Sequence, residues 1–159
     1  GSKKYDNCLR IIKIHCYYPI VSFMHYPDSL MNPVKVTRPE PVFVDERGSI
    51  TDLINSTEPI HHIGRLVFTP GAVRANHYHK ESDQYDFILE GEIELATKSL
   101  EEGAEVHTVI LKPGDLVFIP RHIIHAYRAV KDSTVINVTS TSRAGMKYEE
   151  DTIRVDPLF

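Results

Sequence analysis

Two histidines spaced two residues apart, His77 and His79, are the residues of this chain best placed to do chemistry. Side chains of a β-strand alternate between its faces, so a strand through this segment would present both imidazoles to one side. A third imidazole, His125, follows a second strand-like segment bounded by Gly114 and Pro120. Neutral imidazole is both a metal ligand and a base near neutral pH. The three side chains could therefore bind one metal ion or move a proton on a substrate.

The segments that must position these histidines have the composition of short β-strands. Runs rich in β-branched and aromatic residues alternate with turns that contain Gly, Pro or Asp. The predicted strands are residues 64–69, 85–89, 92–96, 106–111, 116–119 and 134–138. A short helical turn near residues 147–152 is the only helix that the pattern favours. Short strands at this spacing predict an all-β fold, either an antiparallel sandwich or a barrel of the jelly-roll group.

Composition excludes several classes of function. A chain of 159 residues with 42% hydrophobic and 25% charged residues is typical of one globular domain. The net charge of -4 and the lack of a Lys/Arg-rich run argue against nucleic acid as a partner. No apolar run approaches the roughly 18 residues of a membrane span. Two cysteines, Cys8 and Cys16, make no disulfide framework, and no signal peptide is evident, so we expect a cytoplasmic protein.

The chain is expected to have three parts. Residues 40–142 would form the barrel, and residues 143–159 a C-terminal tail. Residues 1–39 would be an extension and linker, of which residues 10–23 are strand-prone. An extension of this kind could cover a sheet edge of a second copy, and two-fold dimers are the commonest oligomers. We therefore expect a homodimer with a possible N-terminal dimer arm.

The first histidine segment resembles the first motif of the cupins. That motif is a glycine, five residues, His-x-His, a glutamate a few residues later, and a second glycine. Gly71, His77, His79 and Gly91 match it, and Gln84 stands at the glutamate position.

The second segment resembles the second cupin motif, in which Gly114, Pro120 and His125 match. His122 stands at the second glycine of that motif, and Ala129 stands at its asparagine. The resemblance implies a double-stranded β-helix, the jelly-roll barrel of the cupins. It says less about activity, because this family contains dioxygenases, decarboxylases, isomerases, epimerases, storage proteins and sugar sensors.

The cupin resemblance implies a metal site made of His77, His79, Gln84 and His125. Three imidazoles and one amide oxygen suit one divalent transition metal ion, which could be zinc, nickel, manganese or iron. An amide in place of a carboxylate leaves the ion more of its positive charge, with which it can polarise a substrate carbonyl. This favours an isomerase or lyase over a dioxygenase. Cupins that act on uronate sugars resemble this arrangement, so the leading hypothesis is a metal-binding cupin acting on a carbohydrate-like carbonyl substrate.

A narrower likeness is to cupins of deoxysugar biosynthesis. Residues 45–49, Asp-Glu-Arg-Gly-Ser, and residues 74–80, Arg-Ala-Asn-His-Tyr-His-Lys, are similar to patterns of the nucleotide-sugar 3,4-ketoisomerases. The dTDP-4-dehydrorhamnose 3,5-epimerases are more distant. Ala75 replaces a glycine of the ketoisomerase pattern, and no tyrosine matches the tyrosine acid of those enzymes.

This second likeness implies a different use of the same residues. Those enzymes work without metal, so His77 or His79 would be the base that takes a proton beside a ketone. Arg74 would hold the nucleotide diphosphate, because a guanidinium can bind phosphate through two hydrogen bonds. Regular alternation puts Arg74 on the face opposite His77, so this role requires a bulge or loop between them. A third hypothesis is a sugar-binding or sensory cupin without catalytic activity.

Overall fold

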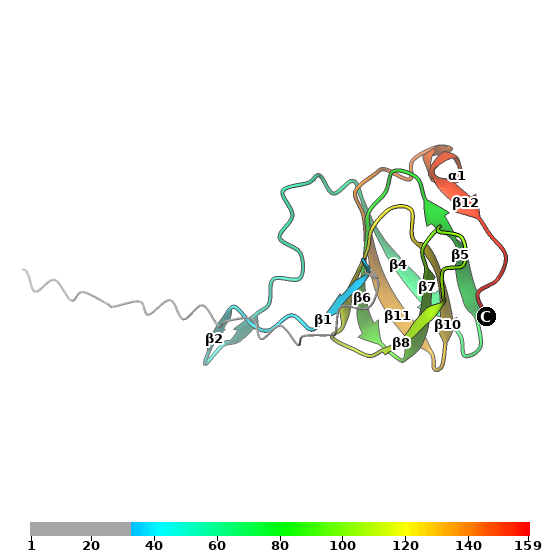
Figure 1. Ribbon diagram of the computed structural model, residues 1–159. Coiled ribbons are helices and arrows are strands. Elements are labelled where there is room, and N and C mark those ends of the chain that lie inside the picture. Colours follow the sequence, from blue (N-terminus) through cyan, green and yellow to red (C-terminus); the bar gives the residue numbers. More distant parts are fainter. Residues whose placement is uncertain (1–32) are drawn as a thin grey trace, which may run out of the picture. The chain divides into compact units, whose positions relative to one another are not determined.

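The computed structural model describes residues 33–159, in which two antiparallel five-stranded sheets face each other (Figure 1). In spatial order, the first sheet contains β1 (Lys35–Thr37), β9 (Leu116–Ile119), β6 (Gln84–Glu90), β11 (Ser133–Thr139) and β4 (His62–Phe68). The second contains β12 (Thr152–Arg154), β5 (Val73–His79), β10 (Ile124–Ala129), β7 (Ile93–Lys98) and β8 (His107–Leu111). A separate hairpin is formed by β2 (Phe43–Asp45) and β3 (Gly48–Ile50). One helix is described, α1 (Lys147–Asp151).

The predicted all-β jelly-roll fold is confirmed. Each of the six strands predicted from composition corresponds to an observed strand, with ends that differ by no more than two residues. The strands β1 and β12 lie outside the predicted barrel of residues 40–142, and each adds to one sheet edge. The strand-prone residues 10–23, with their predicted role as a dimer arm, lie outside the described residues. Within residues 33–159, no helix is both long and apolar enough to cross a membrane.

The barrel interior is apolar at one end and polar at the other. On β6 the inward side chains change from Ile88 to Asp86 and Gln84, all of them buried. The neighbouring strand β11 changes in step, because Val135 pairs with Ile88 and Asn137 pairs with Asp86. The apolar half is one cluster of buried side chains, Phe68, Ile88, Ile93, Leu95, Leu111, Val117, Ile119, Ile123, Tyr127, Ala129 and Val135. This cluster provides most of the hydrophobic stabilisation, which leaves the polar half available for chemistry.

A β-bulge interrupts β5 directly before the histidine pair. His77 pairs with His125 of β10, but the next pair is Ala75 with Ala126, so Asn76 is an extra residue. Beyond the bulge, Arg74 pairs with Tyr127 and therefore shares the inward face of the sheet with His77. The bulge that the predicted diphosphate-binding role of Arg74 requires is thus present.

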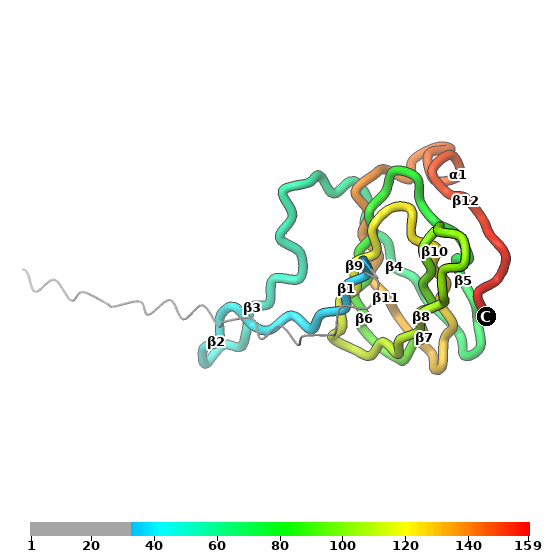
Figure 2. The backbone as a smooth tube through the Cα atoms, viewed as in Figure 1, coloured from blue at the N-terminus to red at the C-terminus, as the bar shows by residue number. Residues whose placement is uncertain are grey.

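The chain after β12 runs along β5 and is hydrogen-bonded to the bulge (Figure 2). The backbone amide of Val155 donates to the Asn76 carbonyl oxygen at 2.9 Å. The amide of Leu158 donates to the Asn76 side-chain oxygen, also at 2.9 Å. Because both acceptors belong to the extra residue, this segment stabilises the bulged conformation.

Two residues that stand at glycine positions of the related motifs have left-handed backbone conformations. The φ angle is 71° at Ala75 and 67° at His122. A non-glycine residue in this region costs about 1–2 kcal/mol, whereas glycine adopts it freely. We expect Ala75→Gly and His122→Gly each to raise the free energy of unfolding. The gain should be roughly 0.5–1 kcal/mol, after the greater chain entropy of glycine in the unfolded state is deducted.

Urea denaturation followed by circular dichroism measures this effect. The matched control is Gly71→Ala, where φ is 80° and an added Cβ would meet nothing within 4 Å. That substitution should lower the free energy of unfolding, because it introduces the strain that the other two remove. A loss of stability in both glycine variants would contradict the assignment of strain.

Candidate functional site

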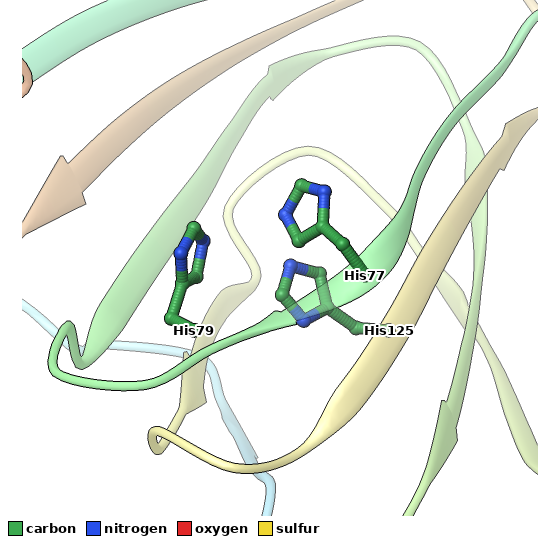
Figure 3. Close-up of side chains that lie close together, drawn as sticks. All are labelled: His77, His79 and His125. Atoms are coloured by element: carbon green, nitrogen blue, oxygen red, sulfur yellow. The ribbon is translucent and has the colours of Figure 1, made fainter. Parts of the chain in front are cut away.

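Three imidazoles meet in the polar half of the barrel. His77 and His79 project from β5, and His125 projects from the adjacent strand β10 (Figure 3). Their possible ligand nitrogens all lie within 4.8 Å of one another. The ring centroids are 4.7 Å apart for His77 and His125, and 4.8 Å apart for His77 and His79. The structure therefore brings together the three histidines singled out by their spacing, while their predicted roles remain predictions.

Burial keeps these imidazoles neutral at physiological pH. The pKa of His77 falls to about 2, first because of burial and then because the other two histidines repel its charged form. The pKa of His125 falls to about 4, again mainly through burial. The pKa of His79 is also lowered by burial, but Asp151 opposes this change. Neutral imidazoles are the form that can take a proton or bind a metal ion.

His79 is held by a carboxylate that the sequence analysis missed. Its Nδ1 lies 3.1 Å from Oδ2 of Asp151, the last residue of α1. The Ser82 hydroxyl and the Glu81 amide each donate to this carboxylate at 2.6 Å. Burial raises the pKa of Asp151, but these hydrogen bonds outweigh it, and the net pKa lies below its usual value. Asp151 is therefore a carboxylate that lies beside Nδ1 of His79, and within residues 33–159 neither nitrogen of this ring makes a hydrogen bond.

His125 is oriented by the backbone. Its Nδ1 lies 3.0 Å from the carbonyl oxygen of Ile123, which can only accept, so Nδ1 carries the proton. Nε2 is then a lone-pair nitrogen, and within residues 33–159 it is buried without a hydrogen-bond partner. Such a nitrogen fits a metal ion or a polar group of a ligand.

Gln84 lies in the polar half of the barrel and is linked to a buried acid. The Gln84 side chain is 4% exposed, and its Nε2 donates to Asp86 Oδ2 at 2.6 Å. Asp86 also accepts hydrogen bonds from the Tyr127 hydroxyl and from Asn137 Nδ2. Burial raises the pKa of Asp86, and the three donors oppose that change. With its nitrogen bound to Asp86, Gln84 has its oxygen left for other partners. Its predicted role as a metal ligand stays a prediction.

A tyrosine and an arginine lie beside the histidines, and the sequence analysis missed both. The ring of Tyr148, from α1, is 6.2 Å from that of His77 and 6.3 Å from that of His79. The guanidinium carbon of Arg143 lies 4.9 Å from the centroid of the Tyr148 ring. Burial lowers the pKa of Arg143, and within residues 33–159 it forms no salt bridge. An unpaired, half-buried cation beside neutral imidazoles favours a ligand with a negative group.

Arg74 lies apart from the histidines. Its guanidinium carbon is 5.3 Å from the centroid of the Phe68 ring, and its Nη2 donates to the Val67 carbonyl oxygen at 3.3 Å. The side chain thus extends towards the apolar end of the barrel, although the bulge gives Arg74 the inward face. Its predicted role in binding a diphosphate is not tested by this arrangement.

No sequence signal would have identified Arg143, Tyr148 or Asp151. All three belong to residues 143–159, which the sequence analysis assigned to a tail. Their types are common on protein surfaces, and they follow no spacing rule. They meet the histidines only because the segment after β11 folds back so that β12 pairs with β5.

The chain is similar in sequence or fold to several known proteins. Residues 64–139 match the family of cupin domains. A protein named for spore coat polysaccharide biosynthesis, SpsL from Bacillus subtilis (strain 168), is 27% identical over 110 residues, which are 62% of this chain and 73% of that protein.

Solved structures with the same fold include two epimerases and a ketoisomerase. A dTDP-4-dehydrorhamnose 3,5-epimerase from Sulfolobus tokodaii is 18% identical and has a TM-score of 0.65, covering 82% of this chain and 84% of its own. A 3,4-ketoisomerase from Helicobacter canadensis is 23% identical, with a TM-score of 0.63 and coverage of 77% and 90%. A double mutant of ChmJ, a 3'-monoepimerase from Streptomyces bikiniensis in complex with dTDP, is 16% identical, with a TM-score of 0.68 and coverage of 84% and 74%. The sequence motifs and the fold agree with the family match, and residues 64–139 of the chain are similar to cupin domains.

Proposed function

We propose that the protein is an isomerase or epimerase of a nucleotide-linked keto sugar, in which a histidine moves a proton on the carbon beside the ketone. The observation that carries this proposal is the buried pair of His79 and Asp151, 3.1 Å apart. A carboxylate on one imidazole nitrogen orients the ring and stabilises the imidazolium that forms when the other nitrogen takes a proton. The sequence left His77 and His79 as alternative bases. The pair favours His79, because His77, with a pKa of about 2, is the weaker base.

In the proposed step, Nε2 of His79 takes a proton from the carbon beside the ketone. The electrons of the broken C–H bond form an enolate, whose oxygen needs a hydrogen-bond donor. The Tyr148 hydroxyl suits this task, since Tyr127 already donates its proton to Asp86. Delivery of a proton to the opposite face of the same carbon, from a water molecule or a second acid on that side, gives an epimer, and His79 then loses the abstracted proton to solvent. A keto isomer forms when a proton moves from the neighbouring hydroxyl oxygen to the enolate oxygen and His79 gives its proton to the former carbonyl carbon.

Arg143 is the cation best placed to hold the nucleotide part of such a substrate. Its charge acts on all three histidines, lowering the pKa of each. Arg128, on β10, is occupied by a salt bridge to Glu94 at 2.5 Å. A diphosphate beside Arg143 would place the attached sugar towards the histidines.

The relatives support the proposal through the substrates that their names give. The epimerase from Sulfolobus tokodaii is named for dTDP-4-dehydrorhamnose, and ChmJ has been captured with dTDP-quinovose and with dTDP. The ChmJ double mutant replaces one histidine with asparagine and one tyrosine with phenylalanine. These are the two residue types that the proposal uses here.

Hydrogen exchange of the substrate in deuterated water tests the proposal. The protein should incorporate deuterium beside the ketone of a dTDP-linked 4-keto-6-deoxy sugar, and it should do so equally well with excess EDTA present. Binding of the dTDP sugar without exchange would favour the sugar-binding hypothesis instead.

A metal-binding cupin is the second candidate, favoured by the close approach of the three histidines. His77, His79 and His125 would hold the ion, because their nitrogens converge and His125 Nε2 has no other partner among the described residues. A bound ion would polarise a substrate carbonyl. Elemental analysis of protein purified without a nickel column separates the candidates. Near-stoichiometric metal that is lost in His79→Ala, together with exchange that EDTA abolishes, would replace our proposal with this one.

A further inference from the structure

The outer face of the first sheet is apolar where a polar face is expected. On β6 the side chains that face the barrel interior are Gln84, Asp86 and Ile88. The side chains between and after them point outward, and all are apolar or aromatic: Tyr85, Phe87 and Leu89. The outer face of an antiparallel sheet is normally polar where water covers it. This pattern therefore indicates that something other than water covers the face.

The apolar side chains continue in register across the neighbouring strands. One row crosses four strands and consists of Ile63, Val138, Tyr85 and Phe118. The rings of Tyr85 and Phe118 lie against each other, with centroids 4.8 Å apart. The next row contains Ile136 and Phe87. These six side chains form one continuous surface, the outer patch, in which Ile63 is 69% exposed.

Among residues 33–159, the hairpin of β2 and β3 does not close the outer patch. The segments that lead into and out of it approach Phe87 through Pro39 and Leu53, but a hollow of about 340 Å³ lies between them. The hairpin also exposes apolar side chains of its own, including Val44 and Ile50. A two-stranded hairpin is only marginally stable by itself. The outer patch and the hairpin thus both leave apolar surface for a partner.

Two opposite charges lie on the same face of the sheet. Arg65 of β4 pairs with Ile136 and therefore points outward with it. Glu90 of β6 pairs with Thr134, whose hydroxyl donates to the Glu90 carboxylate at 3.4 Å. Thr134 in turn pairs with the half-exposed Val67, so Glu90 shares this face. Neither Arg65 nor Glu90 forms a salt bridge with the described part of the chain.

The positions of these charges favour a second copy of this chain as the partner. Arg65 lies two strands, about 10 Å, from β6, and Glu90 lies roughly 7 Å along the strands from the row of Arg65. A two-fold axis that runs diagonally between β6 and β11 exchanges these two positions. Two copies related by this axis would therefore place each Arg65 opposite Glu90 of the other copy. Their strands would cross steeply, as in orthogonal packings of two sheets.

The size of the face suits a stable dimer. Its five strands cover roughly 440 Å² in plan, at about 4.8 Å between strands and about 3.3 Å per residue. A standard interface buries about 800 Å² of accessible surface on each partner. The relief of the side chains and the exposed hairpin bring the available surface to that order.

We propose that the outer patch is the interface of a two-fold symmetric homodimer, in which Arg65 of each copy pairs with Glu90 of the other. The apolar outer face is then the core between two packed sheets, which accounts for its composition. Each contact of such an interface occurs twice. The interface contains no residue of the histidine site, so it does not depend on the proposed reaction.

Sedimentation equilibrium of the full chain tests the interface. Wild-type protein should have twice the mass of one chain. Ile63→Lys should raise the dissociation constant at least about a hundredfold, because an apolar contact is lost twice and a charge is buried in its place. The side chain of Ile63 is exposed in a single copy, so the variant should fold. The matched control is Ile110→Lys, the same change at a 43% exposed position of β8, which should leave the constant within about twofold.

Two results would overturn the proposal. One is a wild-type protein that stays monomeric, and the other is a dimer that Ile63→Lys leaves intact, since that dimer would use a different surface.

Charge reversal tests the pairing of Arg65 with Glu90. Arg65→Glu and Glu90→Arg should each raise the dissociation constant by roughly tenfold or more, since like charges then face each other across the interface. The double variant exchanges the two charges and should return the constant to within about threefold of the wild-type value. Additive losses would mean that the two residues do not face each other, and would overturn the pairing together with the axis that it defines.

Discussion

Replacement of His79 by asparagine is expected to lower the rate of deuterium incorporation into the substrate by about 10²–10⁴-fold, the usual contribution of a general base. Asparagine has a similar size and still hydrogen-bonds, but it cannot take a proton. The apolar cluster that stabilises the fold includes neither His79 nor Asp151, so the variant should remain folded. The measurement is ¹H NMR of the dTDP sugar in deuterated water, with circular dichroism as the folding check.

Two further variants test whether a loss of rate in His79→Asn is specific to the site. His107→Asn changes an exposed histidine on β8 and should leave the rate within about twofold, because it touches no part of the site. Asp151→Asn should lower kcat by at least about tenfold with little change in KM, since the imidazolium loses its counter-charge. A His79→Asn protein with the wild-type rate would shift the role of base to His77 or His125.

The sequence was sufficient for the fold and for the three histidines because both follow local rules. Strand composition predicted β4, β6, β7, β8, β9 and β11, and two-residue alternation predicted that His77 and His79 share a face. His125 was found because it matches the histidine of the second motif, although β10, the strand that holds it, was not among the predicted strands. Each of these inferences needs only neighbouring residues.

The rest of the site depends on contacts between distant residues. Asp151 reaches His79 over 72 positions of the chain, and the Tyr148 ring approaches it only because the C-terminal segment returns to β5. The role of Gln84 illustrates a subtler limit. Its position was predicted, but the direction of its amide follows from the hydrogen bond that its nitrogen donates to Asp86, and no rule of spacing contains that information.

The buried histidines also make stability depend on pH, and this is the second large effect that we expect. In the unfolded chain a histidine binds a proton below about pH 6.5. In the folded protein, burial shifts protonation to lower pH, since the pKa is about 4 for His125 and about 2 for His77. Between these values the unfolded state binds more protons, so the free energy of unfolding falls as the pH falls. The loss begins near the unfolded pKa of about 6.5 and continues until each folded pKa is reached.

The expected size of this loss allows a clear measurement. Each such histidine contributes about 1.4 kcal/mol per pH unit, so His77 and His125 together should remove roughly 2–3 kcal/mol between pH 6 and pH 5. That is a large part of the 5–15 kcal/mol by which domains are usually stable, to an order of magnitude. Urea denaturation at a series of pH values measures it, and His125→Gln should flatten the slope by about one proton. Burial raises the pKa of Asp86, so its protonation makes the free energy of unfolding rise as the pH falls. Asp86 is present in both the wild-type protein and the His125→Gln variant. The difference between their two slopes is therefore due to His125. Equal slopes in both proteins would mean that His125 is already protonated, or is solvated, in the folded state, and that it cannot be the neutral imidazole that the site requires.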